Sequence, residues 1–304
     1  NGGDGAGNYY HPAGAGSGGS IWLIADNISG SGSISVNGGN TPDENADGGG
    51  GSGGRIAMYF TTNSIPNTNI IANGGKPLSP SGGSQRGGAG TIYTKSSSQT
   101  NGDLRLDNVE TTWTTNRNSY AITPFNTSIT MDTITVNNYA MVQNNSTITT
   151  TNLNIKNSAS FYNESSSTTN YINLDWSGGI IIDNGGTFEL LIGEGDLTIP
   201  INSLLETNVA RTFSSIVVDG TLSHSQNWTS ETYKLNLTVE GNFTINSSGS
   251  INTNVKGYDG GYGPGAGGSG PSGAGGAGHG GYGGDGIGQP GGPPYGSASE
   301  PTNI

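Results

Sequence analysis

The stretch GGSIWLIADNISGSGSISVNGG (Gly18–Gly39) recurs further along the chain as GGRIAMYFTTNSIPNTNIIANGG (Gly53–Gly75). A shortened third copy begins with GGAGTIYTK (Gly87–Lys95). Self-similarity at a fixed period of about 20 to 50 residues is typical of stacked repeats. The first part of the chain is therefore predicted to be a stacked array. The anchor isoleucines of the three copies are 35 and 36 residues apart: Ile21, Ile56 and Ile92.

Each copy is predicted to form a strand, a polar turn, a second strand and a loop rich in glycine, serine and proline. The short apolar runs hold β-branched and aromatic residues, which strands favour. The Gly-Gly pairs beside these runs are expected to adopt positive φ where the chain bends sharply, because glycine tolerates it. This glycine-rich block, with its period near 36, is placed at residues 1–98.

A shorter period organises residues 99–256. Short apolar runs such as ITV, LNI and INL recur there at a regular spacing. A period near 19 favours one coil of a parallel β-helix with short strands and tight turns. The apolar residues that carry the spacing fall in two series: Ile134, Leu153 and Ile172, then Ile216 and Leu235.

Residues 257–304 form a low-complexity, glycine-rich tail. Composition alone would indicate disorder. An ordered glycine tract must instead satisfy its backbone polar groups. It could do so by polyproline-II-like packing or by ladder pairing with neighbouring segments. Helix formers are scarce along the whole chain, so at most one helical turn is expected, in Ser203–Phe213.

The composition fits a thin core that repeats along an axis. Apolar residues make up 30% of the 304, and the 56 glycines bring no side chain to bury. A core one short strand wide needs few large apolar residues, since each coil contacts only its neighbours. We therefore expect an all-β fold: a parallel β-helix (β-solenoid) with glycine-rich loops and a glycine-rich tail.

Charge is sparse and its balance is acidic. The formal net charge is −12, with ten lysines and arginines in total. This balance argues against nucleic-acid binding, which requires basic residues to neutralise phosphates. No apolar run approaches the ~18–20 residues of a membrane-spanning helix, so no membrane insertion is expected. The chain has no cysteine, so disulfides do not hold the fold together.

The two ends of the chain read as two halves of one glycine-rich block. The end, GGPPYGSASEPTNI, could run directly into the start, NGGDGAGNYYHPAGAGSGG. Two hypotheses follow. Either the chain is one unit of a longer tandem array, or the tail of one subunit packs on the first block of a neighbouring subunit. The second arrangement would give a head-to-tail filament.

The segments GGSIWLIADNISGSGSISVNGG and GGGGSGGRIAMYF resemble glycine-rich parallel β-helix repeats of very large bacterial and archaeal cell-surface proteins of the filament and adhesin type. The tail GGPPYGSASEPTNI resembles the stretch that precedes such repeats. The resemblance covers the first and last blocks, roughly half of the chain. It implies a parallel β-helix in an extracellular setting, and it carries over no catalytic residue.

Nine Asn-X-Ser/Thr sequons are candidate glycosylation sites. Their number is close to what chance gives in a chain so rich in asparagine, serine and threonine. Exposed polar turns would nevertheless be good acceptors of sugars. The nine asparagines are Asn27, Asn126, Asn144, Asn145, Asn163, Asn227, Asn236, Asn242 and Asn246.

Two acidic clusters are candidate calcium sites, because calcium takes several oxygen ligands at one place. The first lies in one loop and consists of Asp43, Glu44 and Asp47, and the second consists of Glu194 and Asp196. Solvated acidic residues in turns are the simpler interpretation of both. No other metal and no organic cofactor is expected.

A polysaccharide lyase or glycosidase is the enzyme that a β-helix would suggest. Glycoside hydrolysis requires two facing carboxylates, and nothing in the sequence places any two opposite one another. Trp176 and Trp228 could stack on sugars, although aromatic residues that cap coils are more common. The three histidines are scattered and form no site. We expect no enzyme; the carboxylates considered are Asp183, Glu189, Glu194 and Asp196.

The first functional hypothesis is therefore an extracellular structural protein that associates with copies of itself into a filament, sheath or surface fibre. An end coil exposes strand edges, which are templates for a further subunit. The second hypothesis is a cell-surface adhesin module that binds glycans or another surface through the first block. The third is a polysaccharide-active enzyme.

Overall fold

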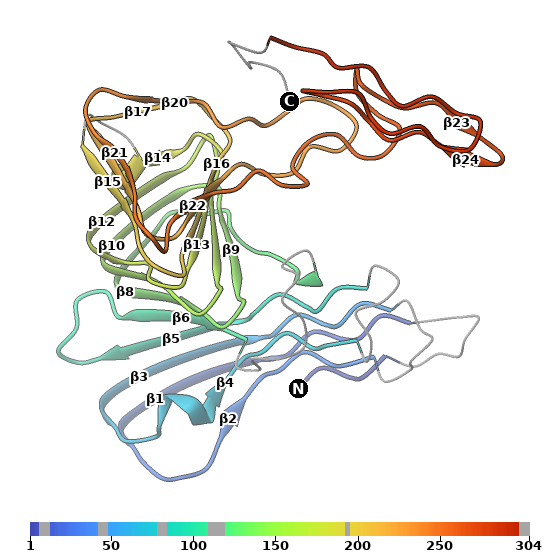
Figure 1. Ribbon diagram of the computed structural model, residues 1–304. Coiled ribbons are helices and arrows are strands. Elements are labelled where there is room, and N and C mark those ends of the chain that lie inside the picture. Colours follow the sequence, from blue (N-terminus) through green and yellow to red (C-terminus); the bar gives the residue numbers. More distant parts are fainter. Residues whose placement is uncertain (6–12, 42–47, 78–83, 109–118, 192–194, 298–304) are drawn as a thin grey trace. The chain divides into compact units, whose positions relative to one another are not determined.

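The computed structural model describes residues 1–5, 13–41, 48–77, 84–108, 119–191 and 195–297 (Figure 1). The described chain is all-β and contains no α-helix; 3-10 turns occur at η1 (Asn67–Asn69) and η4 (Glu189–Leu191). No helix of the described chain is long and apolar enough to cross a membrane. The chain forms two compact units. Unit 1 comprises Asn1–Ile181, Gly185–Ile192 and Pro200–Leu204, and unit 2 comprises Ile182–Asn184, Gly193–Ile199 and Leu205–Ile304.

Unit 1 is built on an eight-stranded sheet with the order β1-β3-β5-β6-β8-β10-β12-β14. Neighbouring strands are parallel except β5 and β6, which form an antiparallel pair. The strands are β1 (Ser20–Ile28), β3 (Arg55–Asn63), β5 (Thr91–Ser96), β6 (Asp103–Asp107), β8 (Ile129–Asn137), β10 (Thr147–Ile155), β12 (Thr168–Asp175) and β14 (Thr187–Phe188). Shorter parallel pairs come from β2 (Ile34–Ser35) with β4 (Ile70–Ile71), and from β7 (Thr123–Phe125), β9 (Met141–Asn144) and β11 (Ser160–Asn163).

The repeat near 36 residues is confirmed by the strand register. Ile21 pairs with Ile56, and Ile56 pairs with Ile92, as the sequence alignment predicts. Alternate residues of β3 point to opposite faces, so Ile56 and Met58 are buried while Arg55 is exposed. The buried side chains of these repeats form one apolar cluster: Ile28, Val36, Ile56, Met58, Ile70, Ala72 and Ile92.

The shorter period holds for its first step and then changes. Leu153 pairs with Ile134 as expected, but on its other side it pairs with Leu174 and not with Ile172. The predicted alignment of Ile172 with Leu153 is therefore wrong, and the Ile172 side chain is 76% exposed. The reason is a shift in the inside–outside alternation in the middle of the strand: Ile172 falls between the registered pairs Thr150–Tyr171 and Asn152–Asn173.

Unit 2 also contains parallel strand pairs. Its strands are β15 (Asp196–Ile199), β17 (Arg211–Phe213), β18 (Ser215–Val218), β19 (Thr221–Ser223), β20 (Leu237–Val239), β21 (Phe243–Ile245) and β22 (Ser250–Ile251). The boundary between the units runs through β13 (Ile180–Asp183) and β16 (Leu204–Thr207). Ile216 pairs with Phe243, whereas Leu235 precedes β20, so the predicted alignment of Ile216 with Leu235 is wrong.

The helical turn expected in Ser203–Phe213 is not formed. This stretch contributes strands β16 and β17 instead. Leu205 and Phe213 are both buried, which extended strands permit. Packing of these apolar side chains therefore decides the conformation of a segment whose local helix propensity is weak.

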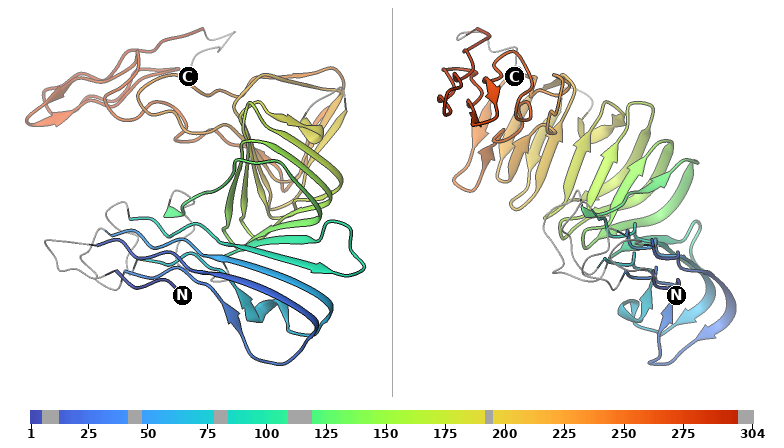
Figure 2. Two further views of the ribbon diagram at one scale, coloured as in Figure 1. Left: turned by 180° about the vertical axis from the view of Figure 1, so that it is seen from behind. Right: turned by 90° about the vertical axis from the view of Figure 1, so that its right-hand side faces the viewer.

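The glycine-rich segments of unit 1 run side by side beyond the ends of β1 and β3 (Figures 1 and 2). Their N–H groups donate to neighbouring segments with a period of three. Gly50 and Gly53 donate to Gln85 and Gly88 at 3.0 Å, whereas Gly51 donates in another direction, to Gly39 at 3.0 Å. Three residues per turn is the repeat of the polyproline-II conformation, so the segments form a bundle of extended glycine helices.

The Gly-Gly pairs in this bundle do not adopt positive φ, contrary to expectation. The glycines with positive φ lie elsewhere, for example Gly30 and Gly102. Most of these glycines are required for a different reason: the segments approach too closely for a side chain, although an added Cβ at Gly19 would meet no atom within 4 Å. A Cβ added at Gly51 would lie 1.9 Å from the carbonyl oxygen of Gly16, and one at Gly75 would lie 1.8 Å from that of Gly39.

The tail satisfies its backbone groups by bonding to itself. Gly275 donates to Gly268 at 2.8 Å, and Gly283 donates to Gly292 at 2.9 Å. Most of its segments bond outside regular ladders, apart from the short antiparallel pair of β23 (Ser269–Gly270) and β24 (Gly273–Ala274). The tail up to residue 297 is thus an ordered bundle within unit 2, and packing on a neighbouring subunit stays a prediction.

Candidate functional site

The outward face of strands β1, β3 and β5 carries large apolar side chains that are exposed and do not pack in the core. Ile21 and Leu23 of β1 turn toward the apolar cluster, so the residues between them turn outward. Trp22 is 68% exposed and Ile24 is 70% exposed as a result. Exposed apolar groups that gather on one face are typical of binding surfaces.

Three aromatic rings cross this face from strand to strand, and we call them the aromatic row: Trp22, Tyr59 and Tyr93. The ring centroids of Trp22 and Tyr59 are 5.1 Å apart with an angle of 34°, and those of Tyr59 and Tyr93 are 5.6 Å apart at 60°. The Tyr93 hydroxyl donates to the carbonyl oxygen of Asn101 at 2.7 Å. Burial raises the pKa of Tyr93, and the nearby Tyr59, Asp132 and Asp103 raise it further.

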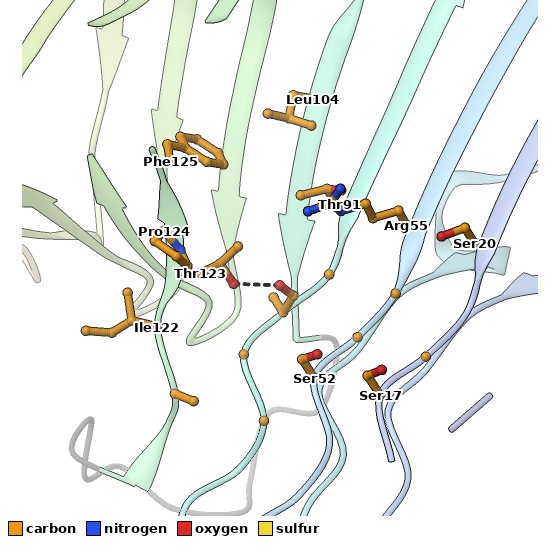
Figure 3. Close-up of a pocket in the computed structure, with 18 of the residues that line it drawn as sticks. Ser17, Ser20, Ser52, Arg55, Thr91, Leu104, Ile122, Thr123, Pro124 and Phe125 are labelled. Atoms are coloured by element: carbon orange, nitrogen blue, oxygen red, sulfur yellow. Dashed lines mark hydrogen bonds between the residues drawn. The ribbon is translucent and has the colours of Figure 1, made fainter. Parts of the chain in front are cut away.

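A groove with a volume of about 810 Å³ begins at Tyr93 and follows the line where the glycine segments leave the strands. Figure 3 shows Ser20, Arg55 and Thr91 on neighbouring strands along it; the register pairs these three residues. Thr123 closes one side by donating from Oγ1 to the carbonyl oxygen of Ala89 at 2.6 Å. The walls therefore present hydroxyl groups and glycine backbone beside apolar side chains.

Arg55 is the only charged residue among those that line this groove. Its guanidinium makes no ion pair or hydrogen bond with any residue in the part of the chain that the structure describes. A guanidinium carries five N–H donors in a fixed plane. The groove therefore holds a directional donor group that the fold itself does not use.

A second groove, of about 480 Å³, lies on the other side of the aromatic row. Tyr59 and Ile24 line it together with the charged residues Asp26 and Lys95. The Lys95 ammonium donates to the carbonyl oxygen of Thr100 at 2.7 Å. Because Tyr93 lines the first groove and Tyr59 the second, the aromatic row connects the two. We call the row and both grooves the aromatic face.

Each unit also has an end strand that no further strand of the described chain covers. In unit 1, β1 is the last strand of its sheet. In unit 2, β21 is the last strand of its sheet, and Phe243 and Ile245 pair with the fully buried Ile216 and Val218. Phe243 and Ile245 are nevertheless 38% and 50% exposed, and Ile251 of β22 is similarly exposed beside buried Leu222. Inward-facing columns thus end on uncovered apolar residues.

The structure separates the nine candidate glycosylation sites by their burial. Three are buried, and their side-chain amides donate hydrogen bonds: Asn144 to Thr169, Asn163 to Gly186 and Asn227 to Tyr233. A sugar on these nitrogens would have to break the contacts. Asn145 is half-buried and donates to Asn126. The exposed asparagines, where glycosylation stays a prediction, are Asn27, Asn126, Asn236, Asn242 and Asn246.

The candidate calcium ligands lie mostly outside the described residues; these are Asp43, Glu44, Asp47 and Glu194. Asp196 is described and exposed, and its Oδ1 accepts a hydrogen bond from the Ser215 hydroxyl at 2.6 Å. Within the described ranges no group of three or more acidic, histidine or cysteine side chains is gathered as a metal site. The calcium hypothesis therefore gains no ligand set from this structure.

The carboxylates considered for catalysis have other surroundings. Asp183 is fully buried, and both its oxygens accept hydrogen bonds from the Arg211 guanidinium at 2.7 Å. A carboxylate held in this way is a structural ion pair with no access to a substrate. Glu189 is exposed at the surface. Trp176 is buried, so its ring is not available to stack on a sugar, whereas Trp228 is 54% exposed.

The aromatic face was missed by sequence reasoning, although the repeat carries its signal. The anchor isoleucines Ile21, Ile56 and Ile92 point inward, so the next residue of each strand must point outward. At two of the three positions that residue is aromatic: Trp22 and Tyr93.

No protein-family model matches the chain, and no curated protein or solved structure shows significant similarity to it.

Proposed function

We propose that this protein is an extracellular structural protein whose strands wind as a parallel β-helix and whose end coils associate with further copies into a filament, sheath or surface fibre. One observation carries the proposal: Phe243, Ile245 and Ile251 continue buried columns, and no further strand of the described chain covers them. Further coils would bury them as Ile216 and its neighbours are buried. Full burial of such a side chain is worth roughly 1.5–3 kcal/mol relative to full exposure, so covering the part that is still exposed contributes about half of this.

The other partner in the contact is the open edge of β1 in another copy. An edge strand presents backbone N–H and C=O groups that can pair with a further strand. A contact between two different surfaces, β21 and β22 on one copy and β1 on the next, propagates without closing. Parallel register between coils, with the same offset along the chain at Ile134–Leu153 as at Asp196–Ser215, supports the β-helical winding.

The extracellular setting rests on the resemblance of the glycine-rich segments to large cell-surface proteins. Glycosylation at the exposed asparagines would fit that setting. We propose no enzymatic activity, and the burial of Asp183 against Arg211 supports this choice.

Assembly can be tested with a double variant of the uncovered columns, Phe243→Ser with Ile245→Ser. We expect the unaltered protein to sediment as large species and to form fibres of uniform width in negative stain. The double variant should associate at least about tenfold more weakly, because the two apolar side chains that are to be buried are lost.

The matched control is Ile287→Ser, since Ile287 is 79% exposed in the same unit but lies in the glycine tail. This variant should assemble like the unaltered protein. A protein that stays monomeric at every concentration would refute the proposal. So would a double variant that forms the same fibres.

A further inference from the structure

We propose that the aromatic face binds a polysaccharide chain, with a pyranose ring stacked on Trp22 and sugar hydroxyl groups hydrogen-bonded in the groove beside Tyr93. This inference goes beyond the assembly role and does not depend on it. It rests on the aromatic row, on the two grooves and on the unused donors of Arg55, all of which lie in unit 1.

The aromatic row supplies the stacking surface. A pyranose ring has an apolar C–H face and a rim of hydroxyl groups, so it fits a flat aromatic ring that is surrounded by polar groups. Trp22 offers such a ring: it is 68% exposed, and its ring centroid lies 5.1 Å from that of Tyr59, which limits the positions open to the indole. Large aromatic side chains give contact area at little cost in conformational entropy.

The groove beside Tyr93 supplies the polar contacts. The hydroxyl-bearing side chains Ser20, Ser52 and Thr91 line it, and Arg55 lies between Ser20 and Thr91 in the strand register. Ser and Thr hydroxyls both donate and accept, as sugar hydroxyls do, while the guanidinium donates only. A ligand with many neutral hydroxyl groups can use all of these groups at once.

The aromatic row runs across the strands, and this direction favours a sugar chain over a peptide as the ligand. An extended peptide gains its affinity by pairing with a sheet edge, along the strand direction. The aromatic row instead crosses three neighbouring strands, β1, β3 and β5, on the face of the sheet. Nucleic acid is disfavoured because the net charge is −12 and Arg55 is the only cation that lines the larger groove.

Affinity electrophoresis in native gels tests the proposal, with hydroxyethyl cellulose, xylan, galactomannan or pectin as the probe in the gel. At least one of these polysaccharides should retard the unaltered protein. Trp22→Ala should lower the affinity for that probe by about tenfold or more, and Trp22→Tyr should restore part of it. Arg55→Gln should cause a smaller loss, about two- to tenfold, as expected for lost hydrogen bonds.

The control variant is Trp228→Ala, which removes a tryptophan that is 54% exposed but lies in unit 2 and is not part of the aromatic row. It should migrate like the unaltered protein in every gel. The proposal is overturned if none of the four probes retards the protein, or if Trp22→Ala binds as the unaltered protein does.

Sedimentation of the same variants separates this proposal from self-assembly. Trp22→Ala should leave the association state unchanged. If it instead abolishes association, the aromatic face is a contact between copies and the sugar-binding proposal fails. Failure of the assembly proposal would leave polysaccharide retardation intact, so the two outcomes are distinguishable.

Discussion

Unit 1 contains two ways of stacking repeats, and they differ in what lies between one repeat and the next. In the glycine bundle, backbone bonds to backbone, and the segments lie so close that a Cβ at Gly51 would meet the Gly16 carbonyl oxygen at 1.9 Å. In the shorter repeats of β8, β10 and β12, side chains fill the space, and Leu153 and Phe161 are fully buried. Repeats can therefore stack in a defined arrangement through close backbone contact between glycines as well as through buried side chains.

Asparagine serves both designs, in different ways. In the glycine-rich repeats the side-chain oxygens form a ladder with the longer period: Asn1 Oδ1 accepts from the Asn37 N–H at 3.1 Å, and Asn37 Oδ1 accepts from the Asn73 N–H at 2.9 Å. In the shorter repeats the amides of Asn144 and Asn163 are buried and donate to the following repeat. Asparagine thus satisfies backbone and hydroxyl groups at turns, where strand ladders end.

The largest loss of stability is expected from a cavity among the packed side chains of the shorter repeats. Leu153→Ala removes most of a fully buried side chain of β10 and should lower the free energy of unfolding of unit 1 by about 2–5 kcal/mol. Urea denaturation, followed by hydrogen exchange of the β8 and β10 amides, would measure it. Thr149→Ala on the exposed face of the same strand is the control, with a change within about 0.5 kcal/mol. Equal losses in both variants would show that β10 does not pack as described.

A single added carbon atom should disrupt the close packing of the glycine segments. Gly51→Ala should destabilise unit 1 by about 1–3 kcal/mol, because the new Cβ overlaps the backbone of a neighbouring segment. Gly49→Ala is the matched control in the same segment, where the nearest atom would be the Gln85 carbonyl oxygen at an ordinary 3.6 Å. That variant should be neutral or slightly stabilised, since alanine restricts the unfolded chain. If both substitutions are tolerated alike, the segments are not packed as closely as the bundle requires.

The sequence predicts the periodic part of this fold. Ile21, Ile56 and Ile92 are in register, as are Ile134 and Leu153, because an apolar residue in every repeat is the condition for a continuous core. The period fails where a strand changes its inward face. Ile172 and Leu174 are both apolar and close together in the chain, so composition alone does not show which of them pairs with Leu153.

The aromatic face and the role of glycine are less visible in the sequence. Alternation places Trp22 and Tyr93 outward, but the ring contacts with Tyr59 depend on how side chains lean across strands. Glycine was expected to provide turns because positive φ is a local property. Its actual role at Gly51 and Gly75 depends on segments far away in the chain, which no local pattern reveals.

The smallest effect concerns an ion pair that links neighbouring repeats at the surface of unit 1. Lys156 follows β10, and its ammonium contacts Asp175 at the end of β12 at 2.5 Å. Hydrogen bonds from Lys156 and Ser177 lower the pKa of Asp175 from 3.8 to about 2. Because the folded pKa lies below the unfolded one, this stabilisation is complete above pH 4 and disappears as the pH falls toward 2. Both side chains are more than a third exposed, so solvent screening keeps the contribution below about 1 kcal/mol.

Asp175→Asn isolates this contribution. At pH 7 the variant should be slightly less stable than the unaltered protein. The difference should shrink as the pH falls below 4 and vanish only below pH 2, where Asp175 becomes protonated in the folded chain as well as in the unfolded one. Urea midpoints at a series of pH values measure the difference directly. A difference that persists unchanged at pH 2 would mean that Asp175 acts through its hydrogen bonds with Ser177 and not through its charge. In that case, the charge of Asp175 would contribute nothing to the contact between β10 and β12, and this contact would rest on side-chain packing and hydrogen bonds.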